Sequence, residues 1–219
     1  MLSAQGVHTS GRTLDYAAGV YDWLSPLMTF GQERRFCGKI IELLELKGNE
    51  RILDVGCGTG TLSIEIAGKL SGMEGSSLVV GLDAAPKMIQ VARRKSEKIQ
   101  AVRFDLGIAE ALPYEDAYFN RVVSGFFFHH INYLLKKRSL EEMCRVLKKN
   151  GTALIIDVDV PENLLGRLCA WSGYFLFHQE EIRENIRGKL REALNGAPFS
   201  GCERMAVYQG YIGLYRLIK

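Results

Sequence analysis

The chain has 219 residues, 47% of them hydrophobic and 24% charged, which suffices for one α/β domain with a full core. The formal net charge of +3 is spread along the sequence and argues against an extended nucleic-acid surface. The five cysteines are widely spaced without a C-x-x-C pair, so they predict a reducing compartment and no metal site.

The start of the chain carries no targeting signal that we recognise. Residues 1–13 are polar and lack the apolar centre of a signal peptide. No run in the chain approaches the roughly 20 apolar residues of a membrane span. We therefore expect a cytoplasmic protein.

Predicted strands and helices alternate along the chain. The expected strands are residues 51–55, 77–82, 101–104, 121–124, 152–158, 204–208 and 211–218. The expected helices are residues 36–46, 62–70, 86 to about 98, and 140–147, the last closed by basic residues and a C′ glycine at Gly151. Repeated βα units predict a doubly wound parallel sheet, and Gln209-Gly210 predicts an antiparallel hairpin at its end. The predicted fold is α/β, a Rossmann-like doubly wound sheet of seven strands, with a helical N-terminal cap.

A glycine-rich turn is the most informative segment of the chain. Residues 51–62 read RILDVGCGTGTL, where an apolar strand ends in an acidic residue and three glycines at two-residue spacing lead into a helix. Glycine has no Cβ, so such a turn lets the backbone approach a ligand closely. Free N–H groups at the helix N-terminus would point at that ligand.

A dinucleotide site is disfavoured by the spacing of this turn. The G-x-G-x-x-G fingerprint would place its third glycine where Thr61 stands. Asp83 ends the next strand, where a carboxylate would meet a ribose diol in either class of site. Its alternative interpretation is an ordinary helix N-cap ahead of Pro86, which would occupy the first helical turn.

Several segments together resemble one protein family. Residues 51–62 resemble motif I of the class I S-adenosylmethionine (SAM) methyltransferases. Residues 107–123 look like that family's G-D-A-E-x-L-P-F…F-D-x-V block, and residues 145–151 look like its R-V-L-K-P-G-G. Residues 21–31, YDWLSPLMTFG, are similar to the Y-D-x-x-N-x-x-M-S-x-G segment of the ubiquinone/menaquinone C-methyltransferases.

The resemblance implies an enzyme that transfers a methyl group from SAM, with S-adenosylhomocysteine as product. It implies that the methionine end of SAM lies by the glycine turn near Asp54, and that Asp83 binds the ribose. The implied cofactor-binding residues are Tyr21, Asp54, Gly56, Cys57, Gly58, Gly60, Asp83, Ala84, Met88, Ile108, Ala109 and Ser124. A single domain is expected, with an N-terminal cap or lid (1–46), a cofactor-binding core (47–160), substrate-covering helices (161–200) and a hairpin (201–219).

Two positions depart from the family's pattern. Ile108 stands where the family usually has an aspartate that reads the adenine amino group, a loss of about 0.5–1.5 kcal/mol for one hydrogen bond. This departure keeps open the alternative of a non-catalytic binding or partner protein with the same fold. Residues 126–130, FFFHH, replace the F-G-x-R-N signature of the quinone enzymes.

The same segment bears on the acceptor and on catalysis. Residues 124–127 lack the D/N-P-P-Y/F/W motif of nucleobase methyltransferases, so we expect a small-molecule or lipid-like acceptor and no nucleic acid. His129 and His130 are the candidate bases, because an imidazole with a pKa near 6.5 can take a proton at neutral pH. Adjacent residues do not easily face one pocket, so at most one is expected to act. The alternative is a packing or capping role for both.

An apolar stretch at residues 164–177 follows the fifth strand. It is too short to span a bilayer, and as a helix it would be apolar nearly all round. It is interpreted either as a core helix or as a lid that closes with residues 21–30 over an apolar acceptor. A lid of this composition would also make a peripheral membrane contact.

Overall fold

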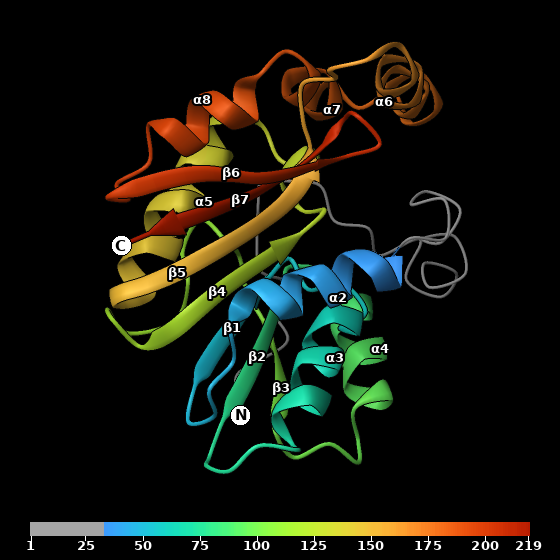
Figure 1. The fold of residues 1–219 in the computed structure, drawn as a ribbon. Helices are drawn as coiled ribbons and strands as arrows, with labels where there is room; N and C mark the ends of the chain where they lie inside the picture. The colour runs from blue at the N-terminus through green and yellow to red at the C-terminus, as the bar shows by residue number, and fades with distance from the viewer. Residues whose placement is uncertain (1–32) are drawn as a thin grey trace. The chain divides into compact units, whose positions relative to one another are not determined.

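The computed structural model describes residues 33–219, in which the chain forms compact units that divide after Ala109. The first unit contributes three parallel strands in the order β3-β2-β1, and α3 and α4 pack on β2 and β3 (Figure 1). Its elements are α2 (Glu33–Leu44), β1 (Arg51–Val55), α3 (Thr61–Leu70), β2 (Leu78–Asp83), α4 (Pro86–Lys95) and β3 (Val102–Leu106).

The first unit brings the carboxyl ends of its strands to one edge. Val55 pairs with Leu82, and Asp83 pairs with Leu106. The strands are apolar runs because both of their faces are covered, and Ile52 is fully buried. In parallel α/β sheets this edge is where ligands bind.

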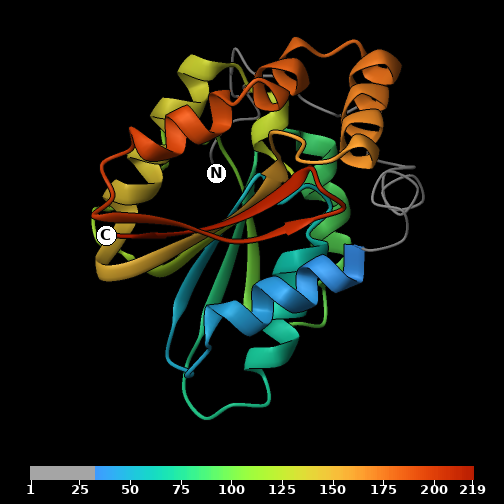
Figure 2. The same ribbon diagram turned by 45° about the horizontal axis from the view of Figure 1, so that its top comes forward.

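The second unit contributes four strands in the order β4-β5-β7-β6 (Figure 2). β4 and β5 are parallel, whereas β7 is antiparallel to both β5 and β6. Its elements are β4 (Phe119–Gly125), the 3-10 helix η1 (Phe128–His130), α5 (Tyr133–Val146), β5 (Leu147–Val158), α6 (Leu164–Phe177), α7 (Glu180–Ile186), α8 (Lys189–Asn195), β6 (Gly201–Tyr208) and β7 (Ile212–Ile218).

The predicted fold class is confirmed. The seven strands are mostly parallel, and the last two form an antiparallel hairpin. In that hairpin Gln209 and Gly210 adopt left-handed φ, and the Tyr211 N–H donates to the carbonyl of Tyr208 at 3.1 Å. The division into cap, core, covering helices and hairpin stays a prediction, because residues 1–32 of the cap lie outside the described residues.

Helix α5 differs from the prediction at both ends. It begins at Tyr133 rather than Leu140, because the Asn132 side chain accepts a hydrogen bond from the Leu135 N–H at 3.0 Å and caps the helix. The predicted C′ glycine is wrong. Leu147 is already extended and begins β5.

The residue with left-handed φ after α5 is Asn150, at 62°. Gly151 is required there for another reason. A Cβ at this position would lie 2.8 Å from the carbonyl oxygen of Lys148. The close approach of two backbone segments therefore explains this glycine. Helix α4 also ends earlier than predicted, at Lys95.

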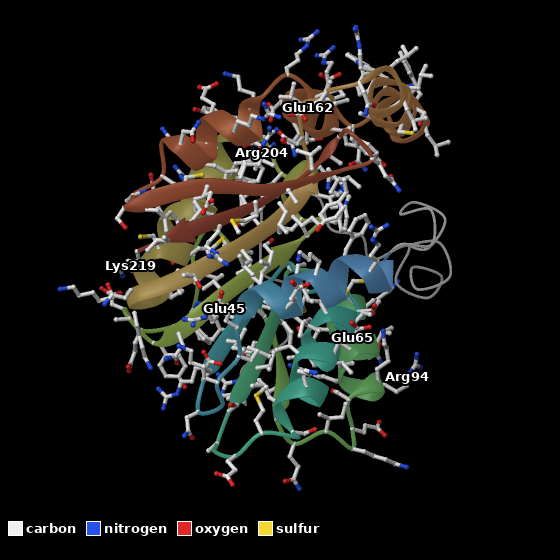
Figure 3. All side chains as sticks on the ribbon, in the orientation of Figure 1. Glu45, Glu65, Arg94, Glu162, Arg204 and Lys219 are labelled. Atoms are coloured by element: carbon white, nitrogen blue, oxygen red, sulfur yellow. The ribbon has the colours of Figure 1, made fainter. Side chains whose placement is uncertain are left out.

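A charged cluster ties the end of β5 to α8 and the hairpin. Asp159 is fully buried and accepts from Arg191 at 2.7 and 2.8 Å and from the Tyr215 hydroxyl at 2.6 Å. Arg204 pairs with Glu162 beside it (Figure 3). Burial and the bond to Asp159 raise the pKa of Tyr215. The three hydrogen bonds that Asp159 accepts hold the end of β5 to α8 and to the hairpin.

Helix α6 exposes its large apolar side chains, whereas an ordinary surface helix buries them. Its packed side carries small residues. Ala170 is 2% exposed, and a Cβ at Gly166 would lie 2.4 Å from the carbonyl oxygen of Gly210. The large apolar side chains face outward and are exposed by 63–74%: Leu164, Leu165, Leu168, Phe175 and Leu176. The interpretation as a core helix is therefore wrong for this face. Among residues 33–219, no helix meets the length and hydropathy of a bilayer span.

Candidate functional site

The turn between β1 and α3 has the backbone that its glycines predict. Gly56, Gly58 and Gly60 have left-handed φ of 72°, 53° and 80°. The N–H groups of Gly56 and Cys57 donate to the carbonyl of Leu82, at 2.8 and 3.1 Å. Gly60 is the N-cap residue of α3, and no side chain caps the helix there. The first N–H groups of α3 can therefore bind an anionic ligand group.

Two glycines of the turn have different neighbours. A Cβ at Gly60 would lie 2.5 Å from the ring of Phe104, so this position is required for packing. Among residues 33–219, a Cβ at Gly58 would meet no atom within 4 Å. Because φ at Gly58 is also left-handed, its bare backbone faces open space in which a ligand can approach it.

Asp83 holds the turn from the neighbouring strand. Its Oδ2 accepts from the Gly58 N–H at 2.9 Å, and its Oδ1 accepts from the Ala85 N–H at 2.8 Å. The N-cap of α4 is Ala85, so the interpretation of Asp83 as the N-cap is wrong, whereas Pro86 does occupy the first turn. A carboxylate can accept from about four donors, and half-buried Asp83 can also accept from the hydroxyls of a ligand.

Asp54 is buried beneath the turn at 1% exposure. The Ser63 hydroxyl, on α3, donates to its Oδ2 at 2.6 Å. The pKa of Asp54 is raised to about 7, mainly by burial, while the bond from Ser63 lowers it and the charge of Asp83 adds to the increase. A cationic group placed nearby would favour the ionised carboxylate.

The free energy of unfolding should fall as the pH rises through the acid range. Folded Asp54 keeps its proton up to a pKa of about 7, whereas the unfolded chain releases it near 3.8. Between these values the folded state binds more protons than the unfolded state, so raising the pH favours unfolding, and above about pH 7 the effect levels off. The shift of about three pKa units corresponds to roughly 4 kcal/mol.

Urea unfolding at pH 5 and pH 8 measures this effect. Asp54→Asn should lose most of the difference between the two pH values, while the exposed-site control Glu97→Gln should keep it. If the free energy of unfolding changed equally between the two pH values in wild type and in Asp54→Asn, Asp54 would not be the source of the pH dependence.

Other predicted cofactor residues lie in the same unit. The Gly107 N–H donates to the Asp83 carbonyl at 3.0 Å and draws the segment after β3 to the end of β2. Ile108, half-buried, and Ala109, 5% exposed, follow in this segment, and Met88 is 2% exposed on α4. Their contact with a cofactor stays a prediction.

The other predicted cofactor residues are Ala84, Cys57, Ser124 and Tyr21. Ala84 follows Asp83 in the turn before α4. Burial and the neighbouring carboxylates raise the pKa of the Cys57 thiol, which therefore stays protonated, in keeping with a space-filling role. Ser124 is fully buried on β4 in the second unit. Tyr21 lies outside the described residues.

The two candidate bases lie together on η1. The ring centroids of His129 and His130 lie 4.0 Å apart. Their Nδ1 atoms contact different side chains. His129, 5% exposed, has its Nδ1 2.8 Å from Oδ1 of Asp157. The Nδ1 of half-buried His130 lies 3.2 Å from Oε1 of the neutral Gln179. His129 therefore has a carboxylate partner at its Nδ1.

Phe126 directly precedes this pair and has an unusual backbone. Its φ is 56°, in the left-handed region that aromatic residues rarely adopt. Its N–H still donates to the carbonyl of Ile156, at 2.8 Å, so the chain turns sharply at the carboxyl end of β4. Such outliers concentrate at functional sites.

Sequence reasoning missed the residues that support the candidate site. Ser63 bonds Asp54, and Asp157 and Lys136 are buried in the second unit at 0% exposure. A signal for Asp157 was present, since it is a carboxylate near the end of an otherwise apolar strand. Lys136 carried no such signal, because its position in a helix of mixed polarity does not show which face is covered. Within residues 33–219, no group of three or more potential ligands is arranged for a metal ion.

Comparisons with known proteins agree with this geometry. A family model described as a methyltransferase domain matches residues 46–195. The chain is 36% identical over 142 residues to the demethylmenaquinone methyltransferase of Thermus thermophilus, covering 64% of this chain and 62% of that protein. It is 31% identical over 159 residues to the ubiquinone/menaquinone biosynthesis C-methyltransferase UbiE of Geobacter sulfurreducens, covering 71% and 60%.

A solved structure is also similar. The crystal structure of a SAM dependent methyltransferase from Aquifex aeolicus has a TM-score of 0.65 at 22% identity, covering 95% of this chain and all of that chain. At this identity the likeness concerns the fold. The matched regions span about three fifths of the length of the two curated relatives, 62% and 60%.

Proposed function

Because the chain belongs to the methyltransferase domain family, we propose that it transfers a methyl group from SAM to a small, apolar or lipid-like acceptor. The observation that carries this proposal is the glycine turn with Asp83 beside it. The bare backbone at Gly58, the uncapped start of α3 and a carboxylate at the end of β2 suit an amino acid joined to a ribose.

In this proposal, residues of the first unit bind the successive parts of SAM, from its methionine end to its adenine. The N–H groups after Gly60 would bind the methionine carboxylate, and Asp54 would balance the ammonium group. Asp83 would accept from the ribose hydroxyls, while Met88 and Ala109 would line the adenine site with Ile108. Tyr21, Cys57, Ala84 and Ser124 complete the proposed set. When bound, SAM supplies a methyl group already activated by its sulfonium.

Two glycine variants separate packing from binding in this turn. Gly60→Ala should lower stability by about 1–3 kcal/mol, because its Cβ would overlap Phe104. Gly58→Ala should cost about 1–2 kcal/mol of backbone strain and also weaken SAM binding, because its Cβ would occupy the ligand's space. Thermal unfolding and calorimetry with SAM measure the two effects.

Gly68→Ala is the matched control for these variants. It lies within α3 with nothing near its Cβ, so it should bind SAM normally and be up to about 1 kcal/mol more stable. Full SAM affinity in Gly58→Ala would contradict the ligand's proposed approach to the turn.

The proposed acceptor is a quinone-like molecule. Two relatives are named for demethylmenaquinone and for ubiquinone/menaquinone biosynthesis, which supports an aromatic, apolar acceptor. The phenylalanines before His129 provide an apolar environment that would exclude water from methyl transfer. The change from F-G-x-R-N to FFFHH implies that the polar contacts to the acceptor differ from those of the quinone enzymes.

His129 would act as the general base where the acceptor still holds its proton. As the acceptor's bond to hydrogen breaks, the proton passes to Nε2 of His129 and the electron pair forms the new bond to the methyl carbon. The bond between that carbon and sulfur breaks, and its electrons remain on sulfur. His129 is preferred to His130 because its Nδ1 contacts the carboxylate of Asp157.

Helix α6 would bind the apolar part of the acceptor and rest on the membrane surface that holds it. The support for this role is its outward face of leucine and phenylalanine, with Arg167 exposed at the edge. We place the protein in the cytoplasm as a peripheral protein. Its five cysteines are all free, as expected in a reducing compartment.

A double substitution on α6 tests this role. Leu168→Ser with Phe175→Ser should raise the acceptor's KM by about 100-fold or more, since each side chain buries apolar area worth about 1.5–3 kcal/mol. SAM affinity and Tm should change little, because both side chains are 63% exposed. Co-sedimentation with anionic vesicles should also fall. Unfolding in step with lost SAM affinity would show instead that this face is structural.

The proposed function is tested by turnover with SAM labelled in its methyl group and demethylmenaquinone, reduced to its quinol, in detergent, because the electrophilic methyl group of SAM needs an electron-rich acceptor. Transfer of the label to the quinone is the expected result. SAM binding without transfer to any apolar acceptor would favour the alternative of a non-catalytic binding or partner protein. Binding of NAD in preference to SAM would overturn the cofactor assignment.

A further inference from the structure

Asp157 is a buried carboxylate held by several donors. It lies at the carboxyl end of β5 with 0% exposure. Its Oδ2 accepts from the Phe128 N–H at 2.6 Å, and its Oδ1 accepts from the Val158 N–H at 2.7 Å. The Asn185 amide lies 3.5 Å from the same Oδ1, and Nδ1 of His129 lies 2.8 Å from it. The carboxylate is therefore fixed before any ligand binds.

These contacts decide which nitrogen of His129 carries the proton. An ionised carboxylate only accepts hydrogen bonds, so the proton in the contact with Asp157 must be on Nδ1 of His129. In the neutral ring, Nε2 then keeps the lone pair that a base requires.

The other ring nitrogen is left accessible. In the part of the chain that the structure describes, Nε2 of His129 has no hydrogen-bond partner. The buried side-chain atoms that lack a partner there are Ser139 Oγ, Glu181 Oε2, Asn185 Oδ1 and Gln209 Oε1, and Nε2 is not one of them. Nε2 therefore retains some exposed surface, although His129 as a whole is 5% exposed.

A buried cation lies in the same region. Lys136 has 0% exposure and donates to the carbonyl of Ile131 at 2.5 Å and to Glu184 at 3.1 Å. Burial lowers the pKa of Lys136, and the carboxylates of Glu184, Asp157 and Glu181 oppose that effect. Asp157 therefore lies close enough to Lys136 for the two charged groups to interact.

We propose that Asp157 is the positioning residue for a His129 base, holding the Nδ1–H tautomer and leaving the Nε2 lone pair for the acceptor's proton. The proposal rests on the proposed function for its catalytic part. Its structural part, the tautomer and its dependence on Asp157, stands independently of any acceptor.

The tautomer can be measured directly in the wild-type protein. Two-bond ¹⁵N–¹H correlation spectra of protein labelled with ¹⁵N-histidine distinguish Nδ1–H from Nε2–H, and His129→Gln assigns the signal among the four histidines. We expect His129 to be neutral at about pH 8 with its proton on Nδ1. A proton on Nε2, or a doubly protonated ring, would overturn the proposal without any variant of Asp157.

Asp157→Asn then tests the link to activity. Its amide group can donate to Nδ1 and so favour the wrong tautomer. We expect kcat for methyl transfer to demethylmenaquinone to fall by roughly 10²–10⁴-fold with KM and SAM affinity nearly unchanged. The matched control Asp116→Asn removes a carboxylate that is 78% exposed in the same unit and should change neither tautomer nor kcat.

The outcomes separate this inference from the proposed function. If wild-type protein does not methylate the quinone but its His129 carries the proton on Nδ1, the proposed acceptor is wrong and the positioning of His129 stands. If Asp157→Asn is folded and retains wild-type kcat, Asp157 has no positioning role. If that variant does not fold, the wild-type tautomer decides.

Discussion

His129→Gln is expected to reduce kcat for methyl transfer by roughly 10²–10⁴-fold, the usual contribution of a positioned general base. SAM affinity should remain within about twofold, because the proposed cofactor residues other than Tyr21 and Ser124 lie in the first unit. Single-turnover kinetics with labelled SAM and demethylmenaquinone, at saturating concentrations of both, measure the chemical step.

The control for this variant is an exposed histidine. His178 follows α6 with a left-handed φ of 47°, which asparagine tolerates, so His178→Asn should retain wild-type kcat. Wild-type turnover in His129→Gln would exclude a base at this position. The methylated atom would then have to lose its proton before binding.

Asp83→Ala is expected to weaken SAM binding by about 100-fold. The loss follows from removing hydrogen bonds to a charged acceptor, each worth about 1.5–3 kcal/mol. It also removes the bonds to the Gly58 and Ala85 N–H groups, so the turn itself should loosen. Calorimetry with SAM measures the affinity, and thermal unfolding of the apoprotein measures the structural part.

Two comparisons make the Asp83 result specific. Glu97→Gln removes a charge from an exposed site in the same unit and should bind SAM normally. Asp83→Asn retains one acceptor oxygen and should lie between wild type and Asp83→Ala. A dissociation constant for Asp83→Ala equal to that of wild type would remove Asp83 from the site.

The sequence predicted the features that depend on local chemistry. The glycine turn was identified because left-handed φ and close backbone approach require residues without a Cβ, and Gly56, Gly58 and Gly60 all adopt such φ values. The doubly wound class of fold was predictable for a similar reason. Apolar runs alternating with helical patterns can form only a few layered arrangements. The motifs that resemble those of the SAM methyltransferases lie in these same segments.

Element boundaries were less well predicted where side-chain capping or backbone contacts decided them. The cap from Asn132 makes α5 begin earlier than its apolar pattern indicated. The nearby carbonyl of Lys148 leaves no room for a Cβ at Gly151. Local propensity did not contain these contacts. In each case the preference of one residue depends on atoms that only the folded chain brings near.

By itself, the sequence determined the class of fold, the glycine turn and the acidic end of the next strand at Asp83, because each follows from residue type and spacing along one continuous segment. Only the tertiary structure decided the partner of His129, the buried position of Lys136 and the outward face of α6. Asp157 and His129 meet across β5 and η1, and the exposed leucines of α6 follow from its small residues packing inward. Contacts between distant segments and the choice of buried helix face depend on the whole packed unit, which no single segment encodes.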